Sequence, residues 1–252
     1  MLVQLSRYYN RSPASLDIEQ VKHYLYHCRE KKGLSVAFVN QTISAFKILK
    51  KDILGEEWGE GLDIQRPRRK SRLPEILSKE ELRSMLDHTY NPKHKALIAL
   101  MYSSGVRLQE FLGLRLADID SDRMLIRIVN GKGGKDRDTI LSGQALLLLR
   151  HYLRHARPRP IHYLFEGMGA PGKPYSRRSV ASVIKAAAKR VGIMKNVTPH
   201  VLRHTCATHL LEQGTDLKSV QKLLGHSNLG STMVYLHVSV TDSTIKSPLD
   251  NL

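Results

Sequence analysis

This chain of 252 residues is poor in cysteine and in aromatic side chains, and it has far fewer acidic than basic residues. Its two cysteines, Cys28 and Cys206, stand far apart and form no Cys-x-x-Cys pair. The sequence therefore indicates neither a zinc ribbon nor a disulfide framework, and we expect a reducing cytoplasm. No apolar run approaches the ~20 residues that a membrane-spanning helix needs, and no signal peptide is visible. We expect a soluble chain of one or two domains.

The shortage of acidic residues leaves a large positive charge. Forty Lys and Arg stand against 23 Asp and Glu, which gives a formal net charge of +17 and a pI near 10.0. An excess of this size usually marks a surface that binds a polyanion, so DNA or RNA is the expected partner. An anionic membrane is the alternative partner. However, the sequence lacks the long, uncharged apolar stretch that a membrane-spanning helix needs, and we expect no membrane association.

Residues 1–65 carry the pattern of a small helical domain. A capping box opens at Asp17, before a helix that Gly33 closes. Ser35 can cap a second helix, whose apolar stripe stops at Gly55. The first ten residues resemble the end of another helix.

Residues 66–74 separate this region from the rest of the chain. The stretch has a proline near each end and almost no apolar residue, which is typical of an extended linker. Its cations could bind a phosphate backbone or could simply be solvated, and the pattern alone leaves both open. They are Arg66, Arg68, Arg69, Lys70 and Arg72.

Residues 75–252 form the larger domain, which includes a C-terminal tail. A capping box of Ser78 and Glu81 opens its first helix, and glycines end several of the others. Between Asp118 and Leu141 the apolar residues alternate around a Gly-rich turn, which predicts two antiparallel strands. The predicted fold class is mainly α with a small antiparallel β-sheet. The predicted helices are 79–88, 93–104, 107–113, 143–156, 177–191, 200–213 and 216–224.

Near the C-terminus, positively charged and proton-carrying groups precede a phenol. A helix that begins after Pro199 puts His200 and Arg203 on one face. The N-terminus of that helix adds partial positive charge and free N–H groups, which suit a phosphate. His226 and Tyr235 follow, so the ordered set could hold a phosphodiester and attack it with a tyrosine.

Zinc is the alternative interpretation of the histidines. His200 and His204 stand four residues apart, a spacing that zinc ligands use on helices. However, no glutamate stands beside His200, and Arg203 would repel a cation from that face. We therefore expect no metal.

Two further cations lie upstream. Arg107 follows a helix break at Gly105, and its guanidinium can bond two phosphate oxygens at once, with Glu110 placed to orient it. Lys132 stands in the Gly-rich turn, where small neighbours let an ammonium reach a ligand held elsewhere. Each feature has a simpler alternative, since Arg107 and Glu110 could form a surface ion pair and Lys132 could be solvated.

Taken together, these motifs resemble the tyrosine recombinase or phage integrase family, particularly its Xer-like and integron-integrase-like members. The resemblance covers about residues 75–240 in order. The matching segments are 104–110 for the first arginine motif, 131–137 for the hairpin lysine motif, 198–204 for the His-x-x-Arg motif, and 223–226 with 235–238 for the last two.

The resemblance implies a site-specific recombinase that cuts and rejoins DNA through a 3′-phosphotyrosyl intermediate and a Holliday junction. Tyr235 would be the nucleophile, while Arg107 and Arg203 would clamp the non-bridging phosphate oxygens. Lys132 would protonate the departing 5′ oxygen. The remaining roles fall to His200, which would help take the tyrosine proton, to His226, which would donate a hydrogen bond to the phosphate, and to Glu110 as a supporting residue.

The resemblance also implies the partners. The first partner is double-stranded DNA with recombination sites. The second is the protein itself, which is expected to form a homotetramer in the synapse and to be a monomer or dimer when free. No cofactor is expected, because the phosphotyrosyl bond keeps the phosphodiester energy. Residues 1–65 would be the DNA-clamping domain. This domain usually has about four helices in the family, and fewer are predicted here, so we expect that it could be truncated. A type IB topoisomerase-like enzyme and a non-enzymatic DNA-binding protein are the alternatives.

Overall fold

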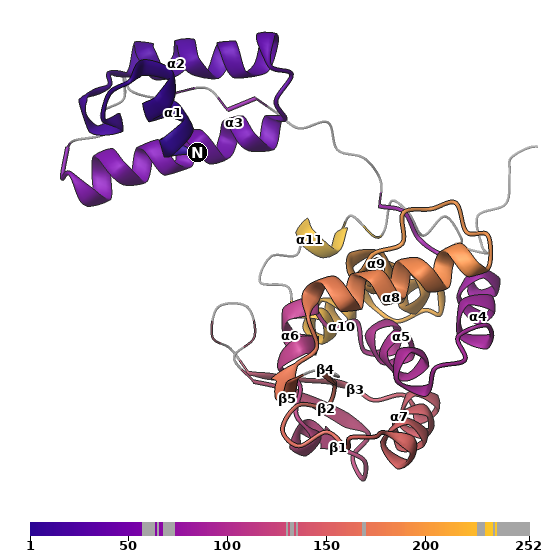
Figure 1. The fold of residues 1–252 in the computed structure, drawn as a ribbon. Helices are drawn as coiled ribbons and strands as arrows, with labels where there is room; N and C mark the ends of the chain where they lie inside the picture. Colours follow the sequence, from indigo (N-terminus) through magenta and orange to yellow (C-terminus); the bar gives the residue numbers. More distant parts are fainter. Residues whose placement is uncertain are drawn as a thin grey trace, which may run out of the picture. The chain divides into compact units, whose positions relative to one another are not determined.

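The computed structural model divides the chain into two compact units, Met1–Arg72 and Leu73–Leu252 (Figure 1). Most of the predicted linker, including Arg68, Arg69, Lys70 and Arg72, lies outside the described residues. No helix in the described part of the chain is long and apolar enough to cross a membrane. The structure describes residues 1–56, 64, 66–67, 74–129, 131, 134, 136–167, 170–225, 230–233 and 235.

The smaller unit is helical, and side-chain caps set where its helices begin. The Asp17 carboxylate accepts a hydrogen bond from the Gln20 N–H at 2.7 Å, and Ser35 Oγ accepts one from the Phe38 N–H at 3.2 Å. The predicted caps are therefore present. The elements are α1 (Leu2–Tyr9), the 3-10 turn η1 (Pro13–Ser15), α2 (Ile18–Tyr26) with the π-helical turn η2 (His27–Lys31), and α3 (Val36–Ile48) with the π-helical turn η3 (Leu49–Ile53).

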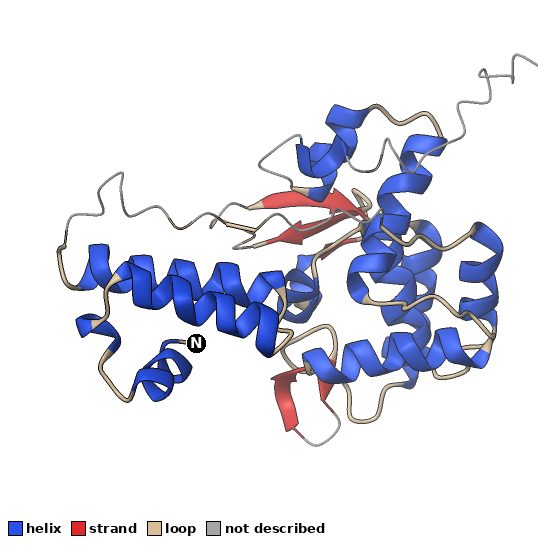
Figure 2. Cartoon of the chain, turned by 90° about the horizontal axis from the view of Figure 1, so that it is seen from above, coloured by secondary structure: helices blue, strands red, loops and turns tan. Residues whose placement is uncertain are grey.

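The larger unit is mostly helical, with its strands confined to two small sheets (Figure 2). Each helix that the sequence predicts in this unit is present, and its ends agree to within one residue. The fold class is therefore confirmed. The elements are α4 (Lys79–Asp87), α5 (Pro92–Ser104), α6 (Leu108–Gly113), η5 (Leu116–Asp118), β1 (Ile119–Asp120), β2 (Leu125–Ile128), β3 (Arg137–Ile140), α7 (Gly143–His155), β4 (Glu166–Gly167), β5 (Ala170–Pro174), α8 (Arg177–Arg190), α9 (Pro199–Glu212), α10 (Leu217–Leu224) and α11 (Gly230–Met233).

The two predicted antiparallel strands are β2 and β3, and β1, which was not predicted, extends the sheet in the order β1-β2-β3. Ile126 pairs with Thr139, and Ile126 and Ile128 are both buried, as the alternating pattern requires. A second sheet, β4 with β5, was not predicted. Strand β5 has the sequence Ala-Pro-Gly-Lys-Pro, whose prolines and glycine are typical of a turn, so no strand pattern was visible.

Helix α5 is the centre of the larger unit and packs against α7 and α9. It is buried on nearly every side, since Leu97, Ile98, Leu100 and Met101 are all fully buried. A helix that is apolar all round belongs in a core. Its C-terminal end is thereby fixed inside the unit, where the candidate site lies.

Candidate active site

Two helix ends meet inside the larger unit. Gly105 follows the last residue of α5 and Gly225 follows that of α10, and both glycines have a left-handed backbone, with φ of 59° and 64°. A Cβ on Gly105 would stand 2.7 Å from the Leu224 side chain, so glycine is required for this close approach. The last carbonyls of a helix have no N–H partner within it and carry partial negative charge. The two ends together therefore offer acceptors for cations.

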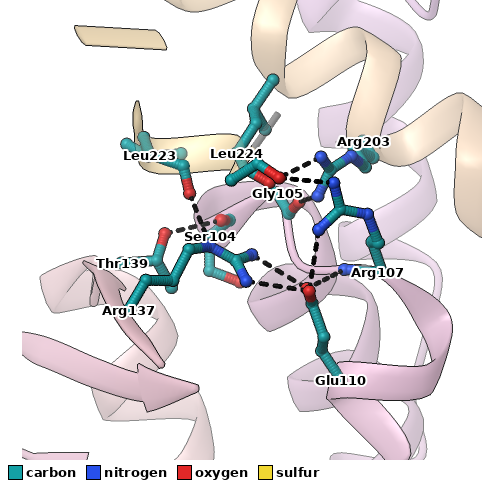
Figure 3. A network of polar contacts seen from close by, with 10 residues as sticks. Ser104, Gly105, Arg107, Glu110, Arg137, Thr139, Arg203, Leu223 and Leu224 are labelled. Atoms are coloured by element: carbon teal, nitrogen blue, oxygen red, sulfur yellow. Dashed lines mark hydrogen bonds and ion pairs between the residues drawn. The ribbon is translucent and has the colours of Figure 1, made fainter. Parts of the chain in front are cut away.

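Arg203, on α9, occupies this position. Its Nη1 donates to the Gly105 carbonyl oxygen at 2.6 Å and its Nη2 to that of Leu224 at 2.7 Å (Figure 3). The residue is 3% exposed. Burial, followed by repulsion from Arg107, lowers the pKa of Arg203 to about 10, so the guanidinium stays charged at neutral pH. Within the described residues it forms no ion pair with a carboxylate.

Arg107, just before α6, lies beside it with different partners. Its Nη1 donates to Glu110 Oε1 at 2.8 Å, and its backbone N–H donates to Glu110 Oε2 at 2.8 Å. Its Nη2 donates to the Gly225 carbonyl oxygen at 2.7 Å. Glu110 thus holds both the backbone N–H and the guanidinium of Arg107 in place.

Arg137, the first residue of β3, completes this network. Its Nη1 and Nη2 each donate to one oxygen of Glu110 at 2.8 Å, and its Nε donates to the Leu223 carbonyl oxygen at 3.2 Å (Figure 3). Burial alone would raise the pKa of Glu110, but the hydrogen bonds and charges of Arg137 and Arg107 outweigh it and lower the pKa to about 2. The sequence pattern indicates no role for Arg137, although this residue lies inside the lysine motif.

Tyr235 is 2% exposed, and its hydroxyl oxygen lies 3.0 Å from Nδ1 of His204. Burial raises the pKa of Tyr235, while the charges of Arg203 and Arg107 oppose that rise. Burial, with repulsion from His200 and Arg203, lowers the pKa of His204 to about 4, so its imidazole is neutral at neutral pH. A neutral imidazole can accept the hydrogen bond of the tyrosine.

His204 is therefore the residue at the tyrosine hydroxyl, whereas its spacing from His200 in the sequence indicated only an alternative zinc ligand. His200 is exposed, and its ring centroid lies 6.4 Å from that of His204. In the sequence, the only feature that could have indicated a role for His204 at the site is its position directly after Arg203.

The structure brings four of the predicted site residues into one cluster. These are Arg107, Glu110, Arg203 and Tyr235, which are spread between positions 107 and 235 of the chain. Lys132 and His226 lie outside the described residues. Of the predicted DNA-binding cations, Arg66 is described and exposed. Chemically, the cluster presents a buried phenol beside two fixed guanidiniums, which suits attack on a phosphate.

The sequence models of known families agree with this arrangement. The model described as "Phage integrase family" matches residues 75–241, and the model described as "Phage integrase, N-terminal SAM-like domain" matches residues 1–60.

Curated relatives cover nearly the whole chain. A putative integrase/recombinase, y4qK, of Sinorhizobium fredii is 36% identical over 234 residues, which are 93% of this chain and 75% of the relative. A tyrosine recombinase, XerD, of Halalkalibacterium halodurans is 33% identical over 244 residues, which are 92% of this chain and 80% of the relative.

Solved structures share the fold. The crystal structure of XerA recombinase is 29% identical, with a TM-score of 0.61, over 96% of this chain and 85% of that one. The post-cleavage complex of XerH site-specific recombinase with a palindromic difH substrate has a TM-score of 0.72 at 24% identity, over 91% of this chain and 71% of that one.

Proposed function

Since the chain belongs to the phage integrase family and is a site-specific tyrosine recombinase, we propose that it cuts and rejoins double-stranded DNA with Tyr235 as the nucleophile. The observation that carries the proposal is the buried cluster in which the Tyr235 phenol stands beside the Arg203 and Arg107 guanidiniums. Relatives named tyrosine recombinases and a related recombinase structure with its difH substrate support DNA as the partner.

In the proposed reaction, the Tyr235 oxygen attacks the scissile phosphorus and the bond from phosphorus to the 5′ oxygen breaks. The phenol proton moves to His204 Nδ1, whose distance of 3.0 Å suits the transfer. Arg107 and Arg203 bind the non-bridging oxygens, where negative charge grows in the transition state. The product is a 3′-phosphotyrosyl bond, which a 5′ hydroxyl of the partner strand later attacks.

Three further residues take the roles that the family resemblance gives them. Lys132 protonates the departing 5′ oxygen, because an alkoxide is a poor leaving group. His226, which follows Gly225 directly in the chain, donates to the phosphate. His200, which is exposed, would help take the tyrosine proton.

The assembly belongs to the same proposal. Strand exchange needs two DNA sites, so we expect a homotetramer in the synapse, built from a free monomer or dimer. The linker cations, including Arg66, would bind the phosphate backbone, with residues 1–65 clamping the DNA. If its substrates are bacterial DNA, the protein would cut and rejoin them in the cytoplasm.

A nicked suicide substrate tests the nucleophile, because loss of a short fragment after cleavage traps the covalent complex. Tyr235→Phe is expected to bind the DNA and to form no denaturation-resistant adduct. Tyr102→Phe is the matched control, since the Tyr102 hydroxyl also contacts a histidine ring, His209, at 2.9 Å. That variant keeps the adduct. An adduct in Tyr235→Phe would overturn the assignment.

A further inference from the structure

Arg137 joins three elements of the larger unit. It begins β3, while Glu110 lies on α6 and Leu223 on α10, and its guanidinium donates to both of them. The Arg137 side chain is 13% exposed and that of Glu110 is 5% exposed. A guanidinium that binds a carboxylate through two parallel hydrogen bonds fixes its direction as well as its charge.

Through Glu110, Arg137 determines where Arg107 points. The carboxylate accepts four hydrogen bonds, two from Arg107 and two from Arg137. Without Arg137, half of these donors would be lost and the buried carboxylate could rotate towards the remaining guanidinium. The head group of Arg107 would then lose its fixed direction.

A second connection to Arg107 runs through Gly225. A Cβ on Gly225 would stand 2.8 Å from both Cδ and Nε of Arg137, so the Arg137 side chain lies directly against this glycine. The Gly225 carbonyl oxygen in turn accepts the Nη2 hydrogen bond of Arg107. Arg137 therefore supports both acceptors that hold the Arg107 guanidinium.

Strand β3 is also anchored at its other end. Thr139 Oγ1 donates to the Ser104 carbonyl oxygen at 2.9 Å, at the end of α5. The strand thus contacts both helix ends that hold Arg203, and it continues directly from the Gly-rich turn that carries Lys132.

We propose that Arg137 is a positioning residue for strand cleavage, which holds Glu110 and Gly225 so that Arg107 meets the scissile phosphate in a fixed direction. The proposal rests on the proposed role of Arg107. In this proposal Arg137 acts through Arg107 and not by its own contact with the scissile phosphate.

The test compares full-length variants in single-turnover cleavage of the suicide substrate at saturating DNA. Arg137→Gln lowers the cleavage rate by about 100-fold, because displacement of a reacting group by about 1 Å costs that much. Arg137→Lys keeps the charge without the paired geometry and restores less than a tenth of the parent rate. Arg123→Gln, an exposed arginine in the turn between β1 and β2, is the matched control for lost charge and keeps the parent rate.

Two measurements separate positioning from a merely structural role. The dissociation constant for the site, measured by gel shift, stays within about threefold of the parent value, so the loss falls on the rate and not on binding. Adding Glu110→Gln to Arg137→Gln costs little further, because both act on one network.

Parent-like cleavage by Arg137→Gln, or fully additive losses in the double variant, would overturn the proposal. If the parent protein formed no adduct at all, the proposed function would fail instead, so the two failures are distinguishable.

Discussion

The two arginines of the site stand side by side in opposite surroundings. Arg107 shares the carboxylate of Glu110 with Arg137, so one carboxylate balances part of the charge of two guanidiniums. Arg203 is more deeply buried; it donates to two carbonyl oxygens and hydrogen-bonds the Tyr235 side chain, with no carboxylate in ion-pair contact among the described residues. The Arg107 side of the site has a carboxylate partner, and the Arg203 side has none among the described residues.

The difference indicates where the phosphate contributes most. Helix-end carbonyls offset a buried cation only in part, which is consistent with the lowering of the pKa of Arg203 to about 10. An anion beside Arg203 would supply the missing negative charge. We therefore expect Arg107 to orient the bound phosphate and Arg203 to contribute most of the electrostatic attraction for it.

The largest expected effect comes from Arg203→Gln. Loss of the uncompensated charge lowers single-turnover cleavage by about 1,000-fold or more, as for other arginines that stabilise phosphoryl transfer. Because no carboxylate loses its partner, the free energy of unfolding changes by only ~1 kcal/mol. Rate measurements with urea unfolding check both parts, and a large loss of stability with parent-like cleavage would reverse the comparison.

Glu110→Gln is expected to lower stability as well as the cleavage rate. Its pKa falls from 4.5 to about 2 in the folded protein, which corresponds to about 3 kcal/mol of stability at neutral pH. This contribution is present above pH 4.5 and is lost as the pH falls towards 2. Urea unfolding of parent and variant should therefore differ at pH 7 and converge in acid. Glu81→Gln, which breaks the partly exposed pair with Lys195, is the control at about 0–1 kcal/mol. If Glu110→Gln lowered the free energy of unfolding no more than Glu81→Gln, the carboxylate of Glu110 would not stabilise the Arg107 side of the site.

The last prediction concerns the pH dependence of stability at His204 in the free protein. Its pKa of about 4 lies below the ordinary 6.5, so the unfolded chain binds more protons than the folded chain between these values. Folding stability attributable to His204 is complete above pH 6.5 and falls as the pH drops towards 4. His204→Gln should flatten this part of the stability profile, and NMR of the imidazole should find it neutral at pH 5.5. A charged His204 at that pH would mean that an anion already compensates the Arg203 side.

Local signals predicted the helices of the larger unit, because caps such as Ser78 and stops such as Gly105 act on neighbouring residues. The motif residues Arg107, Arg203 and Tyr235 were found because their chemistry is specific and their order is fixed. Their partners were harder to predict. Glu110 and Arg137 are 27 residues apart, and His204 and Tyr235 are 31 apart, so only tertiary packing brings each pair together.

The most direct test of the comparison replaces the scissile phosphate with a methylphosphonate, which lacks the negative charge, and measures cleavage by the parent, Arg203→Gln and Glu110→Gln. If phosphate charge completes the Arg203 side, the ~1,000-fold loss in Arg203→Gln shrinks to less than ~10-fold on the neutral linkage. The loss in Glu110→Gln stays the same on both substrates. An equal loss in Arg203→Gln on the charged and neutral linkages would contradict the account.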